Sequence, residues 1–293
     1  MKFDTIKLSE LAAIQTGPFG SQLHKEDYVV HGTPIVTVEH LGSRKFTEQN
    51  LPCVSDKDKE RLKKYVLKTG DIVFSRVGSV DRCSYVSAEY EGWMFSGRCL
   101  RVRPCEKLNP EYLYYFFLLE KTKQFVRNIA TGATMPSINT KFMGEIPIRV
   151  PSLDAQNKIA SILWMIDDKI ELNKKINKNL EQQAQAIYSR MFIEHRQESW
   201  STGQLSDLIS VKYGKDHKKL ADGNYPVYGS GGIMRYVEKP LYTGESVLIP
   251  RKGTLNNIMY VNEAFWSVDT MFYTEMLRPN IAKFVYHFVK SKD

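Results

Sequence analysis

The chain has 293 residues, of which 42% are hydrophobic and 25% charged, so it can bury two ordinary globular cores and does not have a disordered composition. It contains no apolar run of about eighteen residues, and its N-terminal MKFD lacks the basic-then-apolar order of a signal peptide, so we expect a cytoplasmic chain that does not enter a membrane. The net charge is +8: residues 1–150 hold 22 Lys and Arg against 17 Asp and Glu, residues 151–198 hold 7 against 7, and residues 199–293 hold 12 against 9. This balance favours a polyanionic partner, although many unrelated proteins are equally basic.

The first 150 residues are predicted to form short strands separated by turns. Residues 33–39 and 71–77 are rich in β-formers, and residues 98–103 alternate in the manner of a half-buried strand. The charged run 56–61 is expected to open a short helix that has no counterpart later in the chain.

A longer helix is predicted to begin after Asn109. Asn is a good N-cap residue, Pro110 suits the first helical position, and residues 112–125 supply an aromatic face. After it, residues 147–151 (PIRVP) should be extended, because a proline disfavours the helical region in the residue before it.

A long amphipathic helix is predicted next, capped by Ser152 or Asp154. From Ile159 to Met191 apolar residues recur at three- and four-residue intervals, and some forty helical residues would span roughly 60 Å. The expected seam residues are Ile159, Leu163, Ile166, Ile170, Asn173, Leu180 and Ile187. We expect this seam to meet a partner helix, with Asn173 fixing the register; the alternative is a helix packed on its own domain.

The sequence on one side of this helix resembles the sequence on the other. LSEL at 8–11 returns as LSDL at 205–208, GTPIV at 32–36 as NYPV at 224–227, and KTGDIV at 68–73 as YTGESV at 242–247, in the same order. We therefore predict an α+β fold of two mainly β domains joined by a long coiled-coil-type α-helix. The predicted boundaries are 1–150, 151–198 and 199–293.

Motifs that would carry catalysis are incomplete. NPEY at 109–112 is close to the Asn-Pro-Pro-Tyr loop of DNA amino-methyltransferases, but its third residue is Glu, so a helix cap is favoured. GSGG at 229–232 is not followed by Gly-Lys-Ser/Thr and is interpreted as a loop with close backbone approach. The six histidines form no i, i+4 pair and the four cysteines show no C-x-x-C spacing, so we expect reduced structural thiols, with zinc as the alternative. We predict no catalytic residue and no metal site.

Polar and basic loops around glycines recur in both halves of the chain. Their side chains are those that hydrogen-bond base edges and phosphates, and as a set at matching places they favour DNA, although a solvated surface role is the alternative for any one of them. The DNA-binding candidates are Ser21, Gln22, Arg44, Lys45, Arg76, Ser79, Arg82, Arg98, Thr134, Ser137, Asn139, Lys141, Lys215, Lys218, Lys219, Tyr228, Ser230, Arg235, Arg251, Lys252, Thr254 and Asn256. Arg76 and Arg251 each follow a strand-like run near a glycine and are expected to enter the major groove, whereas Lys218 is expected to contact phosphate.

Taken together, these residues resemble the specificity subunit of type I restriction-modification systems over nearly the whole chain. The similar stretches are GPFGS at 17–21, LKTGDIV at 67–73, TGA at 131–133 with PSI at 136–138 and IPI at 146–148, PSLDAQNKIASIL at 151–163, YPVYGSGGI at 225–233 and RKG at 251–253. The 151–163 stretch is similar to the family's Pro-x-x-x-x-Gln-x-x-Ile-Ala start of its conserved helix, and 225–233 to the opening of many target recognition domains.

The resemblance implies two target recognition domains, each reading one half of a split double-stranded DNA site, and a helix that docks modification (methyltransferase) subunits. It implies a non-catalytic chain without cofactors, while S-adenosylmethionine, ATP and Mg would lie on the modification subunits and on a restriction subunit bound through them. The family usually has a second long helix after its second recognition domain, and this sequence stops soon after the counterpart of 112–125. We therefore expect the seam to be covered by another molecule, either an antiparallel second copy in a homodimer or the modification subunits.

Two other functions remain open from the sequence. The chain could be a DNA-recognition fragment of a fused restriction-methylation enzyme, in which case methyltransferase motifs would lie in the same reading frame. It could also be a non-enzymatic helical scaffold whose basic domains bind RNA or protein.

Overall fold

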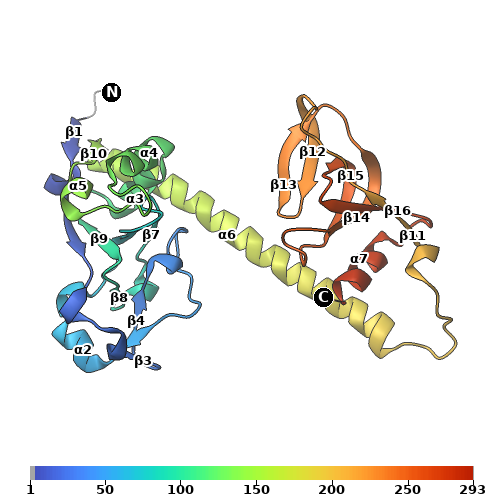
Figure 1. Cartoon of the computed structure of the whole chain (residues 1–293), viewed down its shortest axis with the longest axis horizontal. Helices are drawn as coiled ribbons and strands as arrows, with labels where there is room; N and C mark the ends of the chain where they lie inside the picture. Colours follow the sequence, from blue (N-terminus) through green and yellow to red (C-terminus); the bar gives the residue numbers. More distant parts are fainter. Residues whose placement is uncertain (1–3, 293) are drawn as a thin grey trace. The chain divides into compact units, whose positions relative to one another are not determined.

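The computed structural model describes residues 4–292, apart from the side chains of Asp4, Ser21 and Lys25. These residues form two compact units that divide within one long helix, the first unit ending at Leu172 and the second beginning at Asn173. That helix, α6, runs from Leu153 to Ser189 (Figure 1). The predicted α+β class, with two β units joined by a long helix, is confirmed. In the described part of the chain no helix has both the length and the apolarity needed to span a membrane.

The described residues of the first unit form ten strands. They are β1 Asp4–Lys7, β2 Ala12–Thr16, β3 Tyr28–Val29, β4 Thr33–Val36, β5 Cys53–Val54, β6 Ile72–Ser75, β7 Cys83–Tyr85, β8 Met94–Phe95, β9 Cys99–Pro104 and β10 Pro147–Val150. They make three sheets with the strand orders β2-β9-β6-β7, β3-β5-β4-β8 and β1-β10. The neighbours β4 and β8 are parallel, and the other pairs are antiparallel.

The central sheet of the first unit is buried on both faces, which follows from the two-residue period of its strands. Ile72 and Phe74 of β6 lie in one core cluster together with residues of the helix that follows β9. Val73 points the other way, into a second core cluster with residues of β4 and β8. Thus β6 is apolar on both faces, and β9 carries Arg101 on the face shared with Cys99.

The helices of the first unit are α1 Leu8–Leu11, α2 Asp56–Arg61, α3 Pro110–Leu118, α4 Glu120–Ile129 and α5 Thr140–Gly144. The expected helix at 56–61 is confirmed, and so is the cap at Asn109, whose Oδ1 accepts the Tyr112 amide at 2.7 Å. The prediction of one continuous helix through 125 is wrong. The chain leaves the helical region at Leu119 (φ −60°, ψ 131°), whose carbonyl accepts the amides of Thr122 and Lys123 and so starts α4.

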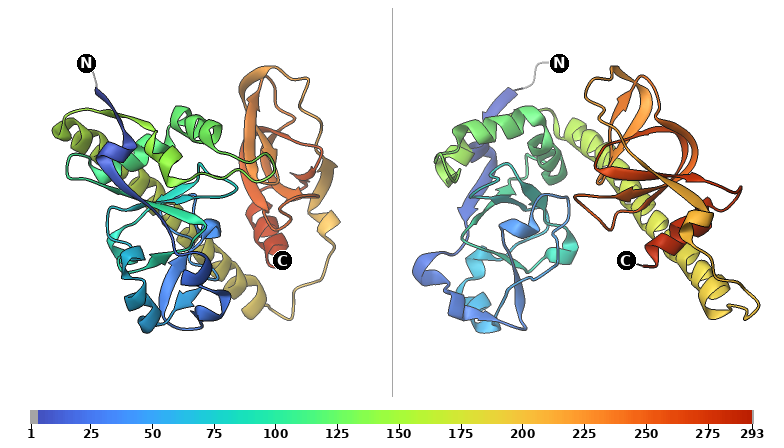
Figure 2. Two further views of the ribbon diagram at one scale, coloured as in Figure 1. Left: turned by 60° about the vertical axis from the view of Figure 1, so that its left-hand side comes forward. Right: turned by 45° about the vertical axis from the view of Figure 1, so that its right-hand side comes forward.

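The second unit contains one larger sheet. Its strands are β11 Ile209–Tyr213, β12 Asp222–Gly229, β13 Gly232–Val237, β14 Tyr242–Pro250, β15 Met259–Ser267 and β16 Met271–Met276, in the order β11-β16-β14-β15-β12-β13. Helix α7, Ala282–Lys290, follows β16 and lies against α6, as both views of Figure 2 show.

The sequence repeat corresponds to a structural repeat. The order β2-β9-β6-β7 of the first unit returns as β11-β16-β14-β15 in the second, and the parallel pair β4 with β8 returns as β12 with the end of β15. Backbone hydrogen bonds match as well: Gly17 N donates to the Cys99 carbonyl at 3.2 Å, and Gly214 N donates to the Met271 carbonyl at 3.0 Å. The two units therefore share a framework and differ in what is attached to it.

One face of α6 packs on the units and another is left open. In the first unit Gln156 and Ala160 are buried and Trp164 is half-buried, and in the second unit Tyr188 is buried. The predicted seam lies on a different face: Ile159, Ile166, Ile170, Leu180 and Ile187 are each more than 40% exposed, Asn173 is exposed, and Leu163 is half-buried. The helix thus packs on its own domains and also presents an unpartnered apolar stripe.

Candidate DNA interface

Four loops of the first unit meet at one end of its central sheet: residues 17–21, 76–82, 96–98 and 131–139. The Gly78 amide donates to the Pro136 carbonyl at 2.8 Å, and Val77 and Ser137 form a β-bridge, which joins loop 76–82 to loop 131–139. The Arg76 amide donates to the Arg98 carbonyl at 2.8 Å, which joins the same loop to residues 96–98.

Glycines allow these loops to approach so closely. A Cβ added to Gly17 would lie 2.2 Å from the Ser96 carbonyl oxygen, and one added to Gly97 would lie 2.4 Å from the Pro18 carbonyl oxygen. Neither carbonyl can move without breaking the loop, so only glycine fits here. Close packing between two loops therefore explains the first glycine of the GPFGS motif, whereas Gly20 has open space around it and a φ of +59°.

Arg76 lies at the centre of this cluster. Its Nη1 donates to the Gly97 carbonyl at 3.1 Å, and its guanidinium carbon lies 5.8 Å from the centre of the Phe19 ring. An arginine has five N–H donors, so one carbonyl bond leaves enough for a base edge or a phosphate.

The second unit brings the loops after β11 and β14 together with the end of β15 and the turn between β12 and β13. The Lys215 amide donates to the Ser267 carbonyl at 2.8 Å, and Trp266 Nε1 donates to the Lys215 carbonyl at 2.8 Å. Asn257 Nδ2 donates to the Ser230 carbonyl at 2.8 Å, so the loop after β14 touches the turn between β12 and β13. A Cβ added to Gly253, which has φ +83°, would lie 2.5 Å from Ser230 Oγ.

Arg251 repeats the contacts of Arg76. Its amide donates to the Thr270 carbonyl at 2.9 Å, and its Nη1 donates to the Asp269 carbonyl at 3.1 Å. Its guanidinium carbon lies 4.8 Å from the Tyr213 ring centre and 5.1 Å from that of Phe272, distances typical of cation–π contacts. The rings of Tyr213 and Phe272 were not among the predicted residues, and no sequence signal other than their strand position could have indicated them.

The structure separates the predicted residues of the first unit into two groups. Arg76, Arg98, Thr134 and Ser137 lie on the meeting loops, with Ser79 on the 76–82 turn, and Arg98 and Thr134 are exposed. Asn139 caps α5 by accepting the Phe142 amide at 2.9 Å, next to the exposed Lys141. The predicted role of Ser21 concerns a side chain outside the described residues.

Other candidates of the first unit are engaged elsewhere. Gln22 accepts the Tyr65 hydroxyl, and Arg82 donates to the Leu41 carbonyl. Lys45 pairs with Glu89 at 2.9 Å. Arg44 is bound to α6, because its Nη2 lies 2.6 Å from Asp168 Oδ1 and its side chain is only 9% exposed. We therefore leave Arg44 out of the interface proposed below.

The candidates of the second unit also divide. Lys215, Lys218, Lys219, Lys252, Thr254 and Asn256 are exposed on the loops that meet, and Ser230 is half-buried in the turn. Tyr228 instead belongs to the core, where its hydroxyl donates to Glu263 at 2.6 Å and burial raises its pKa. Arg235 donates to the Leu220 carbonyl and pairs with Asp222 at 2.9 Å.

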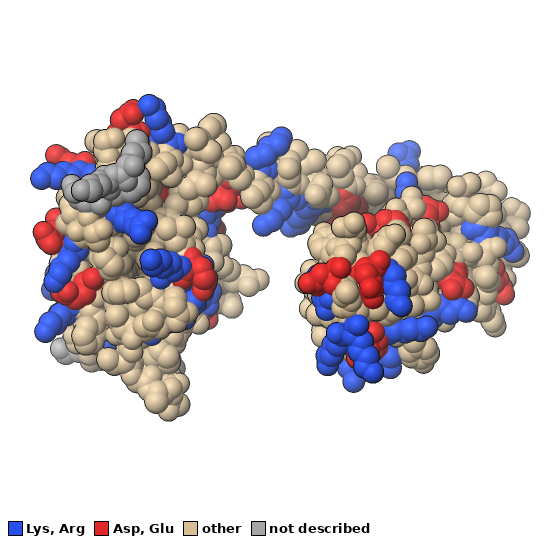
Figure 3. Space-filling view, turned by 90° about the horizontal axis from the view of Figure 1, so that it is seen from above, with Lys and Arg blue, Asp and Glu red and all other residues tan. Residues whose placement is uncertain are grey.

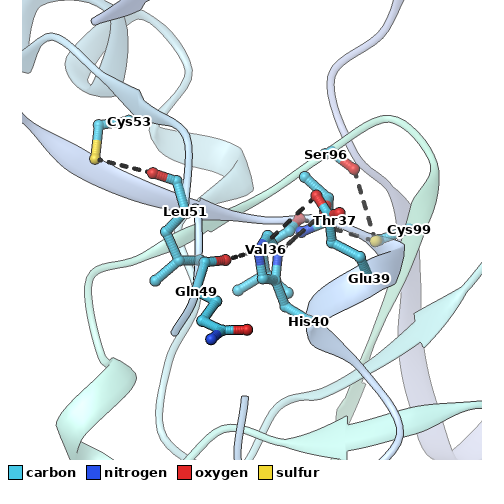
Figure 4. A network of polar contacts seen from close by, with 9 residues as sticks. All are labelled: Val36, Thr37, Glu39, His40, Gln49, Leu51, Cys53, Ser96 and Cys99. Atoms are coloured by element: carbon cyan, nitrogen blue, oxygen red, sulfur yellow. Dashed lines mark hydrogen bonds and ion pairs between the residues drawn. The ribbon is translucent and has the colours of Figure 1, made fainter. Parts of the chain in front are cut away.

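Buried polar side chains of the first unit are paired with nearby protein groups, as Figure 4 shows around His40 and Cys99. His40 is 1% exposed; its Nδ1 accepts the Thr37 amide at 3.0 Å and its Nε2 lies 3.0 Å from the Gln49 carbonyl, so both ring nitrogens have partners. Cys99 Sγ contacts Ser96 and the Val36 carbonyl, and burial raises the pKa of this thiol to about 12. These groups are held for structure, and neither presents a reactive atom to solvent.

Cysteines and acidic residues provide no metal site in residues 4–292. The four cysteines are free thiols, and no group of three or more His, Cys, Asp or Glu side chains there could hold a metal ion. The surface is instead mixed in charge, with Lys and Arg most densely gathered at one edge of the second unit in the view of Figure 3.

Residues 1–182 match the model of the type I restriction modification DNA specificity domain. The chain belongs to this family. Among curated relatives, the HindI specificity subunit of Haemophilus influenzae is 29% identical over 160 residues, covering 53% of this chain and 35% of that protein. A putative MjaX specificity subunit of Methanocaldococcus jannaschii is 33% identical over 175 residues, covering 56% of this chain and 41% of that protein. This chain thus matches less than half the length of these specificity subunits.

Among solved structures, the S subunit of a type I restriction-modification system from M. genitalium shares the fold. The TM-score is 0.64 at 17% identity, covering 99% of this chain and 78% of that one. The specificity-domain fold thus extends through the second unit, beyond the 182 residues that the family model matches.

Proposed function

We propose that this chain is the DNA-specificity component of a type I restriction-modification complex, in which each unit reads one half of a bipartite target. The observation that carries the proposal is the matched pair Arg76 and Arg251. Each guanidinium lies on an aromatic ring, is held by one carbonyl of the neighbouring loop, and is surrounded by polar loop residues. Two equivalent arginines on two separate units suit two separated contacts on one duplex.

The chain would contribute recognition without catalysis. In this proposal S-adenosylmethionine, ATP and Mg are bound by the modification and restriction subunits. This chain brings those subunits to a chosen DNA sequence.

Exchange of one unit tests this function. Replacing residues 1–150 with the first domain of another family member should change one half of the methylated sequence in cells that express the modification subunit, and should leave the other half as it was. A change in both halves, or in neither, would contradict two independent readers. Binding to RNA or protein with no preference among duplexes would favour the scaffold alternative.

The open stripe of α6 requires a partner, and we propose an antiparallel second copy. Ile159 and Ile166 lie toward the start of the stripe and Leu180 and Ile187 toward its end, and all four are more than 40% exposed. An antiparallel copy would place the start of one stripe beside the end of the other, and a two-fold axis makes both contacts equivalent. The resulting helix pair would then dock the modification subunits on its outer faces.

Light scattering tests the helix pair. A stripe of a few hundred Å² left in water forfeits several kcal/mol at about 25 cal/mol per Å², so the purified chain should be a dimer at tens of micromolar. Ile166→Glu with Leu180→Glu should give monomers or aggregates, and Lys158→Glu on the same helix should not. A monomer that assembles only when modification subunit is added would assign the stripe to that subunit instead.

A further inference from the structure

In each unit, α6 is contacted by the helix that follows the last strand of the shared four-stranded order. Helix α3 follows β9, α7 follows β16, and both are nine residues long. Leu113 and Val285 are fully buried at matching places, and the amide of each donates to the carbonyl four residues earlier. Tyr115 and His287, two residues further along, are therefore equivalent positions.

These equivalent residues both bond to α6. The Tyr115 hydroxyl donates to Asp167 Oδ2 at 2.8 Å, and His287 Nδ1 lies 2.8 Å from Gln185 Oε1. The structural repeat thus includes the way in which each unit attaches to the helix.

In the first unit Arg44, from the segment between β4 and β5, adds further contacts to α6. Its Nη2 contacts Asp168 at 2.6 Å and Glu171 at 3.1 Å, and its guanidinium carbon lies 4.5 Å from the centre of the Trp164 ring. Burial disfavours the charge, but the hydrogen bond to Asp168 and the charge of Glu171 outweigh it and raise the pKa, so the group is cationic. Nη2 alone contacts both carboxylates, and Nη1 is buried without a hydrogen-bond partner. The guanidinium is therefore held by two ionic contacts at one nitrogen and by the nearby Trp164 ring, and it has little freedom to turn.

The attachment of the second unit is more open. Glu181 accepts hydrogen bonds from Tyr286 and Lys290, and the side chains of Glu181 and Lys290 are 44% and 32% exposed. The Tyr188 ring packs against Phe284 and His287. Exposed ion pairs of this kind contribute little, so the aromatic packing carries most of this contact.

We propose that Arg44 is a positioning residue for DNA recognition: it locks the first unit onto α6, and the stiffness of that lock determines how strictly the protein discriminates between spacer lengths in its target. This inference rests on the proposed bipartite function. A wrong spacer costs affinity only if a reading unit cannot turn on its helix to follow the DNA. Loosening the lock should therefore relax the spacer requirement while each unit still recognises its own bases.

The test uses Arg44→Met and a set of synthetic duplexes. A pool with two randomised half-sites first yields the preferred target of the unaltered protein, and that target is then made with spacers one base pair shorter and longer. For Arg44→Met the affinity ratio between the best and the altered spacers should fall about tenfold, the equivalent of about 1.4 kcal/mol. The selected bases in each half-site should stay the same. Arg44→Lys, which keeps the charge and loses the planar group beside Trp164, should give an intermediate ratio.

A matched control and a second measurement separate positioning from general damage. Arg127 is also held by two carboxylates, Asp81 and Glu120, but does not contact α6, so Arg127→Met should keep the spacer ratio. Amide hydrogen exchange of residues 160–172 without DNA should be faster in Arg44→Met and unchanged in Arg127→Met. An unchanged spacer ratio or unchanged exchange in Arg44→Met overturns the inference about Arg44 and leaves the proposed function standing. Failure of the unaltered protein to select two half-sites overturns the proposed function, and the inference with it.

Discussion

The two units use one sheet order for different interiors. In the first unit Asp71, 1% exposed, accepts Arg103 Nε and Nη2 at 2.6 Å each, so the end of the central sheet is held by an ion pair whose carboxylate is buried and whose arginine is 30% exposed. In the second unit the residue equivalent to Arg103 is Glu275, which pairs with Lys212 at 3.6 Å on the surface. The shared strand order therefore does not depend on the ion pair that the first unit has at this position.

The units also differ in how much chain they attach to the framework. Between β4 and β6 the first unit inserts β5, α2 and the segment with Tyr65, which packs into the second core cluster. Between β12 and β14 the second unit has the hairpin strand β13. The insertion supplies Arg44, so the first unit, which carries the insertion, is also the unit with a buried ionic contact to α6. A conserved sheet with variable attachments allows the loops that face a partner to change without loss of the fold.

The largest expected effect is on the stability of the first unit. Asp71→Asn leaves Arg103, whose side chain is 30% exposed, without its charged partner, which should lower the free energy of unfolding by about 2 to 3 kcal/mol. The comparison change in the second unit, Glu275→Gln, alters the residue at the position of Arg103, breaks its exposed pair with Lys212 and should cost less than about 1 kcal/mol. Urea unfolding of the two variants measures both. If both variants lost the same free energy of unfolding, the Asp71–Arg103 pair would stabilise the first unit no more than the Glu275–Lys212 pair stabilises the second.

The next effect concerns binding by the matched arginines. Arg251→Ala should cost about 1 to 3 kcal/mol on the preferred target and relax the preference at one base pair in one half-site, and Arg76→Ala should do the same in the other half. Lys218→Ala, an exposed loop lysine, should weaken all duplexes alike. Titrations with the preferred and a random duplex distinguish these cases. Equal losses on both duplexes for Arg251→Ala would make it a phosphate contact.

The smallest effect is on the pH dependence of the second attachment. Hydrogen bonds from Lys290 and Tyr286 hold the pKa of Glu181 below its usual 4.5. Because the pKa is lower in the folded protein, this stabilisation is complete above about pH 4.5 and is lost as the pH falls through the folded value. For a pair this exposed the loss should be a few tenths of a kcal/mol. Thermal unfolding of Glu181→Gln should lack that part of the acid dependence; if the acid dependence stayed the same, the Glu181 bonds would not contribute to stability.

The sequence by itself determined the architecture of this protein. The repeat LSEL to LSDL and KTGDIV to YTGESV indicated two related units, and the three- and four-residue apolar period from Ile159 indicated the long helix. These features are local in the chain, and local periodicity and turn residues encode them directly. The cap at Asn109 and the short helix at 56–61 followed from the same kind of signal.

Tertiary structure alone decided which polar residues face outward. Arg44 and Arg76 look alike in the sequence, yet one is buried against Asp168, 124 residues later, and the other lies on Phe19 among exposed loops. Tyr228 sits in a motif that suggested DNA contact, and its hydroxyl is used by Glu263 of a neighbouring strand. Whether a guanidinium or a hydroxyl is free depends on partners far away in the chain, because a buried polar group must find a hydrogen-bond partner wherever the fold places one.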